Sequence, residues 1–200
     1  MICLINIREK NGKPYDEVWL ISRYVKSCPS GVKVVSDLAP SMDLLMKYRD
    51  WDRSGQWNAQ TFKDRYLPQF LNEINENAKA KNLMNDLYRM DKQGKHVALA
   101  CFCGDESLCH RSIVGGILAY KGVSVCATKD IRSYLEYGKM YDNVVANSSR
   151  TVLSDASKGR ERIRGNSGNS SGCKGVVLPD GWEKMLSEDE VLDEGLSFVD

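Results

Sequence analysis

The sequence has no excess of charge of either sign. Its 200 residues include 28 lysines and arginines and 27 aspartates and glutamates, so the formal net charge is +1. A protein that binds nucleic acid or membranes through its overall charge needs a clear excess of basic residues. The composition therefore excludes binding of that kind and leaves only a local basic stretch as a nucleic-acid contact.

Long apolar runs are also missing. A membrane-spanning helix needs about 20 apolar residues in succession, and no segment approaches that length. The first ten residues contain about six apolar ones, and their charges follow this run instead of preceding it, unlike a secretory signal peptide. We therefore expect a cytoplasmic protein with no membrane partner, built as one domain or as one domain with an appendage.

Histidine is scarce, and its two copies lie in one stretch, residues 96–120, together with three of the seven cysteines. An odd number of scattered cysteines in a cytoplasmic protein indicates free thiols, thiolates or metal ligands. Within the stretch, an apolar run over 97–102 predicts a buried strand, and apolar residues at helical spacing over 113–118 predict a helix. Ligands of open α/β sheets bind beyond the carboxyl ends of strands, so the loop between these elements is the predicted site.

The remaining chain alternates short strands with helices, which predicts an α/β fold with a mostly parallel sheet. Further strand patterns cover residues 2–7, 18–22, 32–35 and 123–126. An Asn-Gly pair near residue 12 is typical of a turn, and it predicts that the first two strands pair as a hairpin at one edge.

Four helices are predicted besides the one after the loop. Ser41 is a good amino-terminal cap for a helix through Tyr48, and residues 49–58 are too irregular for a regular element. An apolar stripe from Thr61 predicts a long helix that Pro68 kinks. The other two cover 83–90, before Gly94, and 130–137, closed by Gly138.

The composition changes near residue 146. We expect a domain over 1–146, a polar basic linker over 147–175 and an acidic amphipathic segment over 176–200 that docks on the domain or on a partner. The linker is either a flexible tether or a contact for nucleic acid through its 150–164 stretch. The basic residues of that stretch are Arg150, Lys158, Arg160, Arg162 and Arg164.

Three interpretations of the loop remain open, and the first is a metal site. Cys101, Cys103, Cys109 and His110 form a C-x-C-x5-C-H pattern of ligands that suit zinc. Structural zinc sites usually combine C-x2-4-C or H-x3-5-H units, so this spacing departs from the usual one.

The second interpretation is catalytic. Cys109 at a helix amino terminus, flanked by His110 and Arg111, is expected to have a lowered pKa and to act as a nucleophilic thiolate. His110 then serves as acid or base, Arg111 binds an anionic group, and Asp105 supports the proton transfer.

The third interpretation is binding without chemistry: His110, Arg111 and the helix amides hold a phosphate or another anion. If residues 18–22 form a central strand, the loop after it reaches the same edge of the sheet, and the tryptophans near residue 57 supply an aromatic wall for a base or sugar. The ligand-binding candidates are Arg23, Lys26, Cys103, Ser112, Trp57 and Tyr66.

Two motifs resemble one family. The apolar run Val97–Cys103 followed by Cys109-His110-Arg111 is similar to the signature of domain of unknown function 488. Asp37-Leu-Ala-Pro-Ser41, followed by Leu44, Leu45, Trp57, Phe62 and Arg65-Tyr66, resembles an "LAPS…L…W…F…RY" pattern of one branch of that family. The resemblance covers approximately residues 18–126.

This resemblance implies a Rossmann-like three-layer sandwich with the Cys-His-Arg loop at the carboxyl ends of the strands, and a bacterial or phage origin. Cys103 and the polar tail depart from the family pattern. Our main hypothesis is an enzyme that acts on a nucleotide or nucleic-acid-derived substrate and needs no cofactor. The alternatives are a non-catalytic module that binds a phosphorylated small molecule, nucleotide or nucleic acid, and a zinc-stabilised interaction domain.

Overall fold

A parallel sheet forms the centre of the molecule. The computed structural model describes residues 1–9, 14–27 and 30–155, so most of the predicted linker and the whole acidic segment lie outside the described residues. All strand pairs are parallel, which confirms the predicted α/β class. The strand order is β3-β2-β4-β1-β5, with β1 Ile2–Asn6, β2 Glu17–Leu20, β3 Val32–Val34, β4 Val97–Cys101 and β5 Val125–Cys126.

The predicted hairpin between the first two strands is wrong. β1 and β2 lie on opposite sides of β4, and Leu4 and Trp19 both pair with Leu99. The reason is burial: all five residues of β4 are buried, and a strand buried on both faces belongs at the centre of a parallel sheet. The turn residues that favoured a hairpin lie outside the described part of the chain.

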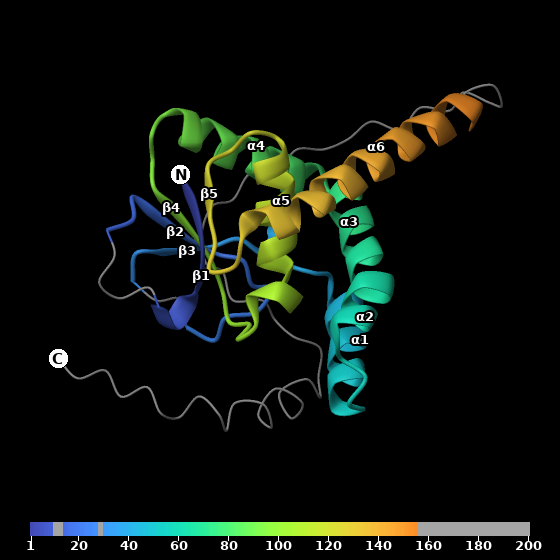
Figure 1. Cartoon of the computed structure of the whole chain (residues 1–200), viewed down its shortest axis with the longest axis horizontal. Helices are drawn as coiled ribbons and strands as arrows, with labels where there is room; N and C mark the ends of the chain where they lie inside the picture. Colours follow the sequence, from blue (N-terminus) through green and yellow to red (C-terminus); the bar gives the residue numbers. More distant parts are fainter. Residues whose placement is uncertain (10–13, 28–29, 156–200) are drawn as a thin grey trace. The chain divides into compact units, whose positions relative to one another are not determined.

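The long helices pack on one face of the sheet (Figure 1). The larger core joins strand residues such as Trp19 and Leu99 to helical residues such as Phe70, Leu87 and Ile117. The helical segments are α1 Met42–Arg53, α2 Ala59–Thr61, the π-helical η3 Phe62–Tyr66, α3 Leu67–Glu76, α4 Ala78–Lys92, α5 His110–Tyr120 and α6 Leu135–Asp155.

The opposite face of the sheet carries a smaller apolar cluster that includes Leu20 and Ala100. The side chains packed against it come from connecting segments: Ile7, Tyr15 and Val25. Among the residues that the structure describes, this face is covered by connections in place of the helical layer that a three-layer sandwich has there.

Local sequence signals predict the start of α1 correctly. The Ser41 hydroxyl accepts a hydrogen bond from the Leu44 amide at 3.2 Å, the cap that the sequence predicts for α1. α1 runs to Arg53, so the irregular segment predicted from residue 49 begins later than expected. Pro68, which is predicted to kink the long helix, lies in the first turn of α3, directly after the widened turn of the π-helical segment.

Gly138 does not end a helix, contrary to the prediction. The 3₁₀ turn η5 (Ile131–Tyr134) leads directly into α6, which contains Gly138 and continues to Asp155, past the predicted domain boundary. A Cβ atom on Gly138 would lie 2.2 Å from the Cβ of Tyr120 at the end of α5. The glycine is therefore required for the close contact between the two helices and not for a helix stop.

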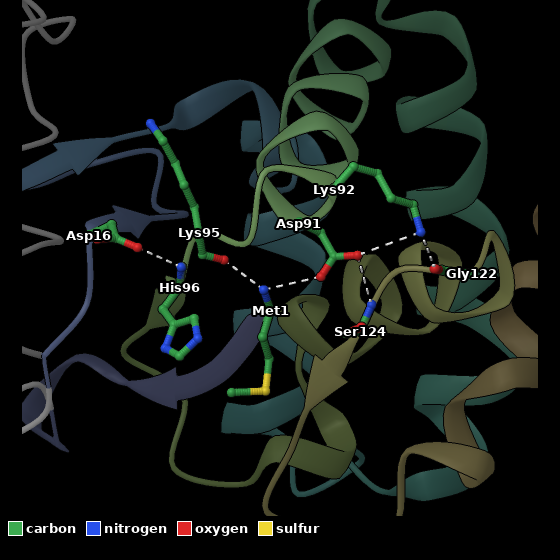
Figure 2. A network of polar contacts seen from close by, with 8 residues as sticks. All are labelled: Met1, Asp16, Asp91, Lys92, Lys95, His96, Gly122 and Ser124. Carbon is green, nitrogen blue, oxygen red and sulfur yellow. Dashed lines mark hydrogen bonds and ion pairs between the residues drawn. The ribbon is translucent and has the colours of Figure 1, made fainter.

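Polar contacts tie together the segments that precede four of the strands, at the amino edge of the sheet (Figure 2). The Asp91 carboxylate contacts the Met1 nitrogen at 3.1 Å and accepts the Ser124 amide at 3.2 Å. The His96 amide donates to Asp16 at 2.7 Å. His96 is therefore part of the edge opposite the predicted site. No helix in the described residues is both long and apolar enough to cross a membrane.

Gly116 gives a direct test of the helix packing. A Cβ atom there would lie 2.2 Å from the backbone oxygen of Tyr134, and such overpacking costs about 1–3 kcal/mol. Alanine gains up to about 1 kcal/mol of helix propensity over glycine, so we expect Gly116→Ala to destabilise the protein by about 1–2 kcal/mol, measured by urea unfolding.

Gly104→Ala is the matched control. No atom lies within 4 Å of a Cβ built on Gly104, and we expect its free energy of unfolding to change by less than about 0.5 kcal/mol. Equal stability of the two variants would contradict the close approach of α5 to η5.

Candidate functional site

The site lies where β4 ends and α5 begins, at the carboxyl edge of the sheet, as the sequence predicts. A loop with the 3₁₀ turn η4 (Glu106–Leu108) connects the two elements. Cys109 is the amino-terminal cap of α5: its backbone is extended, and its sulfur accepts the Arg111 amide at 3.4 Å. The capping position turns the Cys109 side chain back towards the end of β4.

Four side chains converge there, and we call Cys101, Cys103, Cys109 and His110 the Cys/His cluster. Their ligand atoms all lie within 4.8 Å of one another. The sulfurs of Cys101 and Cys109 are 3.1 Å apart, and the Cys103 amide donates to the Cys101 sulfur at 3.1 Å. Cys101 and Cys109 are each 1% exposed, whereas Cys103 is partly exposed. The cluster is therefore buried, with Cys103 on its accessible side, and it has the composition of a metal-binding group.

His110 is held in one orientation by Ile21, the residue directly after β2. Its Nε2 lies 2.9 Å from the Ile21 carbonyl oxygen, an acceptor, so Nε2 carries the proton. Phe70 packs edge-on against the imidazole at 6.0 Å between ring centroids. The other nitrogen, Nδ1, lies 3.9 Å from the Cys109 sulfur. The Nδ1 atom of the imidazole therefore faces the Cys109 sulfur.

The pKa shifts of the three thiols differ in direction. Hydrogen bonds from Cys103 and Cys109 lower the pKa of Cys101 to about 2, and the hydrogen bond to Cys101 raises the pKa of Cys103 to about 12. Burial, together with the hydrogen bond to Cys101, raises the pKa of Cys109 well above its ordinary value. These directions contradict the lowered pKa predicted for Cys109, and they favour negative charge at Cys101.

Arg111 is a buried cation beside this charge. It is 3% exposed, and its Nη1 donates to the Cys103 carbonyl at 3.1 Å. Its Nε is a buried nitrogen with no hydrogen-bond partner among the described residues. Burial acts to lower the pKa of Arg111, but the charges of Cys109, Cys101 and Cys103 raise it overall. The guanidinium therefore favours negative charge on the sulfurs, and its Nε–H is a buried donor available to an anionic group.

The buried side chain of Glu106 holds the loop in place through three hydrogen bonds. Glu106 is not among the predicted site residues. It is 4% exposed, and its carboxylate accepts the amides of Thr128 and Lys129 at 3.2 and 3.1 Å and the Tyr134 hydroxyl at 3.1 Å. These partners are more than 20 residues away in the chain, so no local pattern announces them. Cys101 is predicted only as a possible metal ligand and not as a catalytic or substrate-binding residue, and the structure places its sulfur at the centre of the cluster.

Two predicted ligand-binding aromatics belong to a packed ring cluster. Trp57 contacts Tyr48 at 4.7 Å and Tyr66 at 5.5 Å between ring centroids. Burial raises the pKa of Tyr48 to about 12, and the charges of Asp52, Cys103 and Cys109 add to this. Tyr66 stacks on Phe70 at 5.9 Å between ring centroids, and Phe70 packs against His110, so the ring cluster borders the Cys/His cluster.

The other predicted residues have different positions. The Ser112 hydroxyl is buried and donates to the Cys109 carbonyl at 2.6 Å, which supports the cap. Asp105 is exposed and caps η4 through the Ser107 amide.

Arg23 and Lys26 lie in the loop after β2, and Lys26 is exposed. Arg23 donates to the carbonyls of Pro40 and Ala39 at 2.8 and 3.1 Å. It also lines a cavity of about 310 Å³ together with Phe70 and Glu73. The structure therefore brings Cys103, Cys109, His110 and Arg111 together, and gives Arg23 other partners.

Fold and site together define an α/β protein with a parallel sheet and a buried cysteine-histidine cluster at the carboxyl edge. A family model described as the active DUF488-N3 subclade matches residues 7–122, which include the whole cluster. The match spans more than half of the 200 residues, and the chain belongs to the DUF488 family, as the sequence motifs predict. Comparisons with curated proteins and with solved structures gave no match.

The role of Glu106 is testable by Glu106→Gln. The amide keeps the size of the side chain but places an NH₂ group against a backbone N–H, which leaves a buried donor unpaired. An unpaired buried polar group costs about 1–3 kcal/mol, and we expect a loss of that size in the free energy of urea unfolding.

Glu136→Gln serves as the control for this change. Glu136 is exposed and 4.0 Å from Lys63, a kind of surface pair whose loss costs less than about 1 kcal/mol. If both variants unfold at the same urea concentration as the parent protein, Glu106 does not hold the loop.

Proposed function

We propose that this protein is an enzyme that uses a cysteine thiolate on an anionic substrate of the nucleotide class. One observation carries the proposal: the sulfur of Cys101, at the end of the central strand, accepts the Cys103 amide and lies 3.1 Å from the Cys109 sulfur, beside the buried Arg111. Such an environment stabilises a thiolate, the nucleophilic form of cysteine.

The residues have distinct roles in this proposal. Cys101 supplies the thiolate in place of Cys109, which donates its S–H to Cys101 and caps α5. His110, oriented by the Ile21 carbonyl, takes up or delivers a proton at Nδ1. The unpartnered Nε of Arg111 binds the anionic group of the substrate. Access is from the side of the partly exposed Cys103.

Two features support a nucleotide or nucleic-acid-derived substrate. The amino terminus of α5 and Arg111 provide donors for a phosphate. The ring cluster borders the Cys/His cluster through Phe70, and its partly exposed members Tyr48 and Trp57 offer aromatic surface to a base. The word "active" in the description of the matched family model supports an enzyme and does not indicate a substrate. Free thiols fit a cytoplasmic setting, and the family resemblance fits a bacterial or phage origin.

The thiolate can be detected directly by its ultraviolet absorbance. At pH 6 an ordinary thiol with a pKa of about 8.5 is protonated, whereas Cys101, with a pKa of about 2, is ionised. We expect thiolate absorbance at pH 6 in the parent protein and its loss in Cys101→Ser. Cys126→Ser, which removes an exposed cysteine, is the control and should leave the signal unchanged.

Turnover is then measured on a panel of nucleotides and phosphorylated nucleic-acid ends. Cys101→Ser is expected to abolish turnover, and Arg111→Ala to weaken substrate binding, because a buried charged hydrogen bond to an anion is lost. Absence of thiolate absorbance at pH 6, or its survival in Cys101→Ser, contradicts the proposal.

A second candidate function is a zinc-stabilised domain. It is favoured by the four ligand atoms within 4.8 Å and by the His110 hydrogen bond to Ile21, since zinc-binding histidines commonly donate their other N–H to a carbonyl. Zinc with three thiolates and a neutral imidazole has a net charge of −1, which the guanidinium of Arg111 would balance. Four protein ligands are typical of structural zinc.

Metal analysis separates the two candidates. A zinc-stabilised domain is expected to purify with about one zinc per chain, and a chelator is expected to lower its melting temperature. Cys103→Ser should reduce the zinc content, and Cys126→Ser should not. If the protein contains no metal and the chelator does not change its melting temperature, the zinc-stabilised domain is excluded and the thiolate enzyme is the candidate that remains.

A further inference from the structure

We infer that Cys101 and Cys109 are a modification site: a hydroperoxide oxidises the pair to a disulfide, and a thiol reductant reverses the reaction. The disulfide would regulate the Cys/His cluster, because the Cys101 sulfur could then act neither as a nucleophile nor as a metal ligand. This consequence for activity rests on the proposed function. Formation of the bond rests only on the geometry of the two cysteines.

The two sulfurs are already close to bonding distance. They lie 3.1 Å apart, and a disulfide has an S–S length of about 2.05 Å, so they must approach by only about 1 Å. Cys101 ends β4 and Cys109 caps α5, which are the two elements on either side of the loop. The disulfide would therefore join the end of β4 to the start of α5.

The burial of the pair restricts the size of the oxidant. Cys101 and Cys109 are each 1% exposed, and the neighbouring Cys103 is partly exposed. A protein disulfide is too large to contact Cys101, whereas a hydroperoxide is small. The oxidant class that the proposal names is therefore a small peroxide.

The reaction balances in two steps. The Cys101 sulfur attacks the peroxide: an S–O bond forms, the O–O bond breaks, and the products are a sulfenic acid and an alcohol, or water from hydrogen peroxide. The Cys109 sulfur then attacks the sulfenic sulfur, the S–S bond forms, and the hydroxyl group leaves with the Cys109 proton as water. Two thiols are oxidised by two electrons and one peroxide is reduced.

Cys109, and not Cys103, is the partner in this assignment. The Cys103 backbone amide donates to the Cys101 sulfur at 3.1 Å, and closing a ring between residues two apart would disturb that hydrogen bond. The Cys109 sulfur comes from another element, eight residues along the chain, and the hydrogen bond that it accepts from the Arg111 amide is longer, at 3.4 Å. A peptide map therefore tests whether Cys101 is bonded to Cys109 or to Cys103.

The experiment treats the full-length protein with hydrogen peroxide and maps the disulfide by mass spectrometry. Trypsin and a glutamate-specific protease cut after Lys95, Glu106 and Arg111, so Cys101 and Cys103 share one peptide and Cys109 lies in another. We expect an intact mass lower by two hydrogens, these two peptides cross-linked, and full reversal by dithiothreitol.

Three variants make the test specific. Cys109→Ser keeps an acceptor at the cap of α5, since serine caps helices well, and it should lose the cross-link and accumulate further oxidised Cys101. Cys103→Ser should retain the cross-link and Cys126→Ser should behave as the parent. A bond confined to the peptide with Cys101 and Cys103, or a cross-link that Cys103→Ser removes, overturns the inference.

Thiolate absorbance of the reduced protein keeps the two proposals apart. A thiolate at pH 6 without any cross-link after peroxide would refute the modification site and leave the proposed enzyme intact. A cross-link in a protein without that thiolate would support the modification site and refute the enzyme.

Discussion

The complete burial of β4 is the constraint on which the rest of the structure depends. A strand with five buried residues must be covered on both faces and paired on both sides, and β1 and β2 provide parallel neighbours. Parallel pairing puts the carboxyl ends of all the strands at one edge, so Cys101 and Ile21 meet the start of α5 there. The hydrogen bond from His110 to Ile21 is a direct product of this arrangement.

Much of this was encoded locally. The apolar run of β4, the Ser41 cap and the cysteine at the start of α5 are signals carried by a few neighbouring residues, and the structure contains all three. Strand pairing was not predictable in this way, because β1 and β2 are joined through β4 from a distant part of the chain. Gly138 was misinterpreted for the same reason, since its purpose is set by Tyr120 on another helix.

In the site, too, features set by neighbouring residues were predicted, and features set by distant residues were not. Sequence spacing grouped Cys109, His110 and Arg111 and placed them at a helix amino terminus. The flanking basic residues pointed to a lowered Cys109 pKa, but the folded chain adds burial and a second sulfur, whose effect is larger and opposite in direction. The role of Glu106 could not be predicted from nearby residues. An acidic residue in a polar loop is usually solvated, and the partners that bury Glu106 follow β5, far along the chain.

Burial of so many ionisable groups also restricts what the centre can do. A buried charge is costly unless it is paired and hydrogen-bonded, and the Arg111 guanidinium lies where the charges of the three cysteines and of Glu106 raise its pKa. Further negative charge, whether from additional thiolates or from a substrate phosphate, needs further positive charge, and Arg111 carries only one. A divalent metal would supply two positive charges. In the two proposals, metal binding by all three cysteines and a free thiolate at Cys101 are therefore mutually exclusive states of the Cys/His cluster.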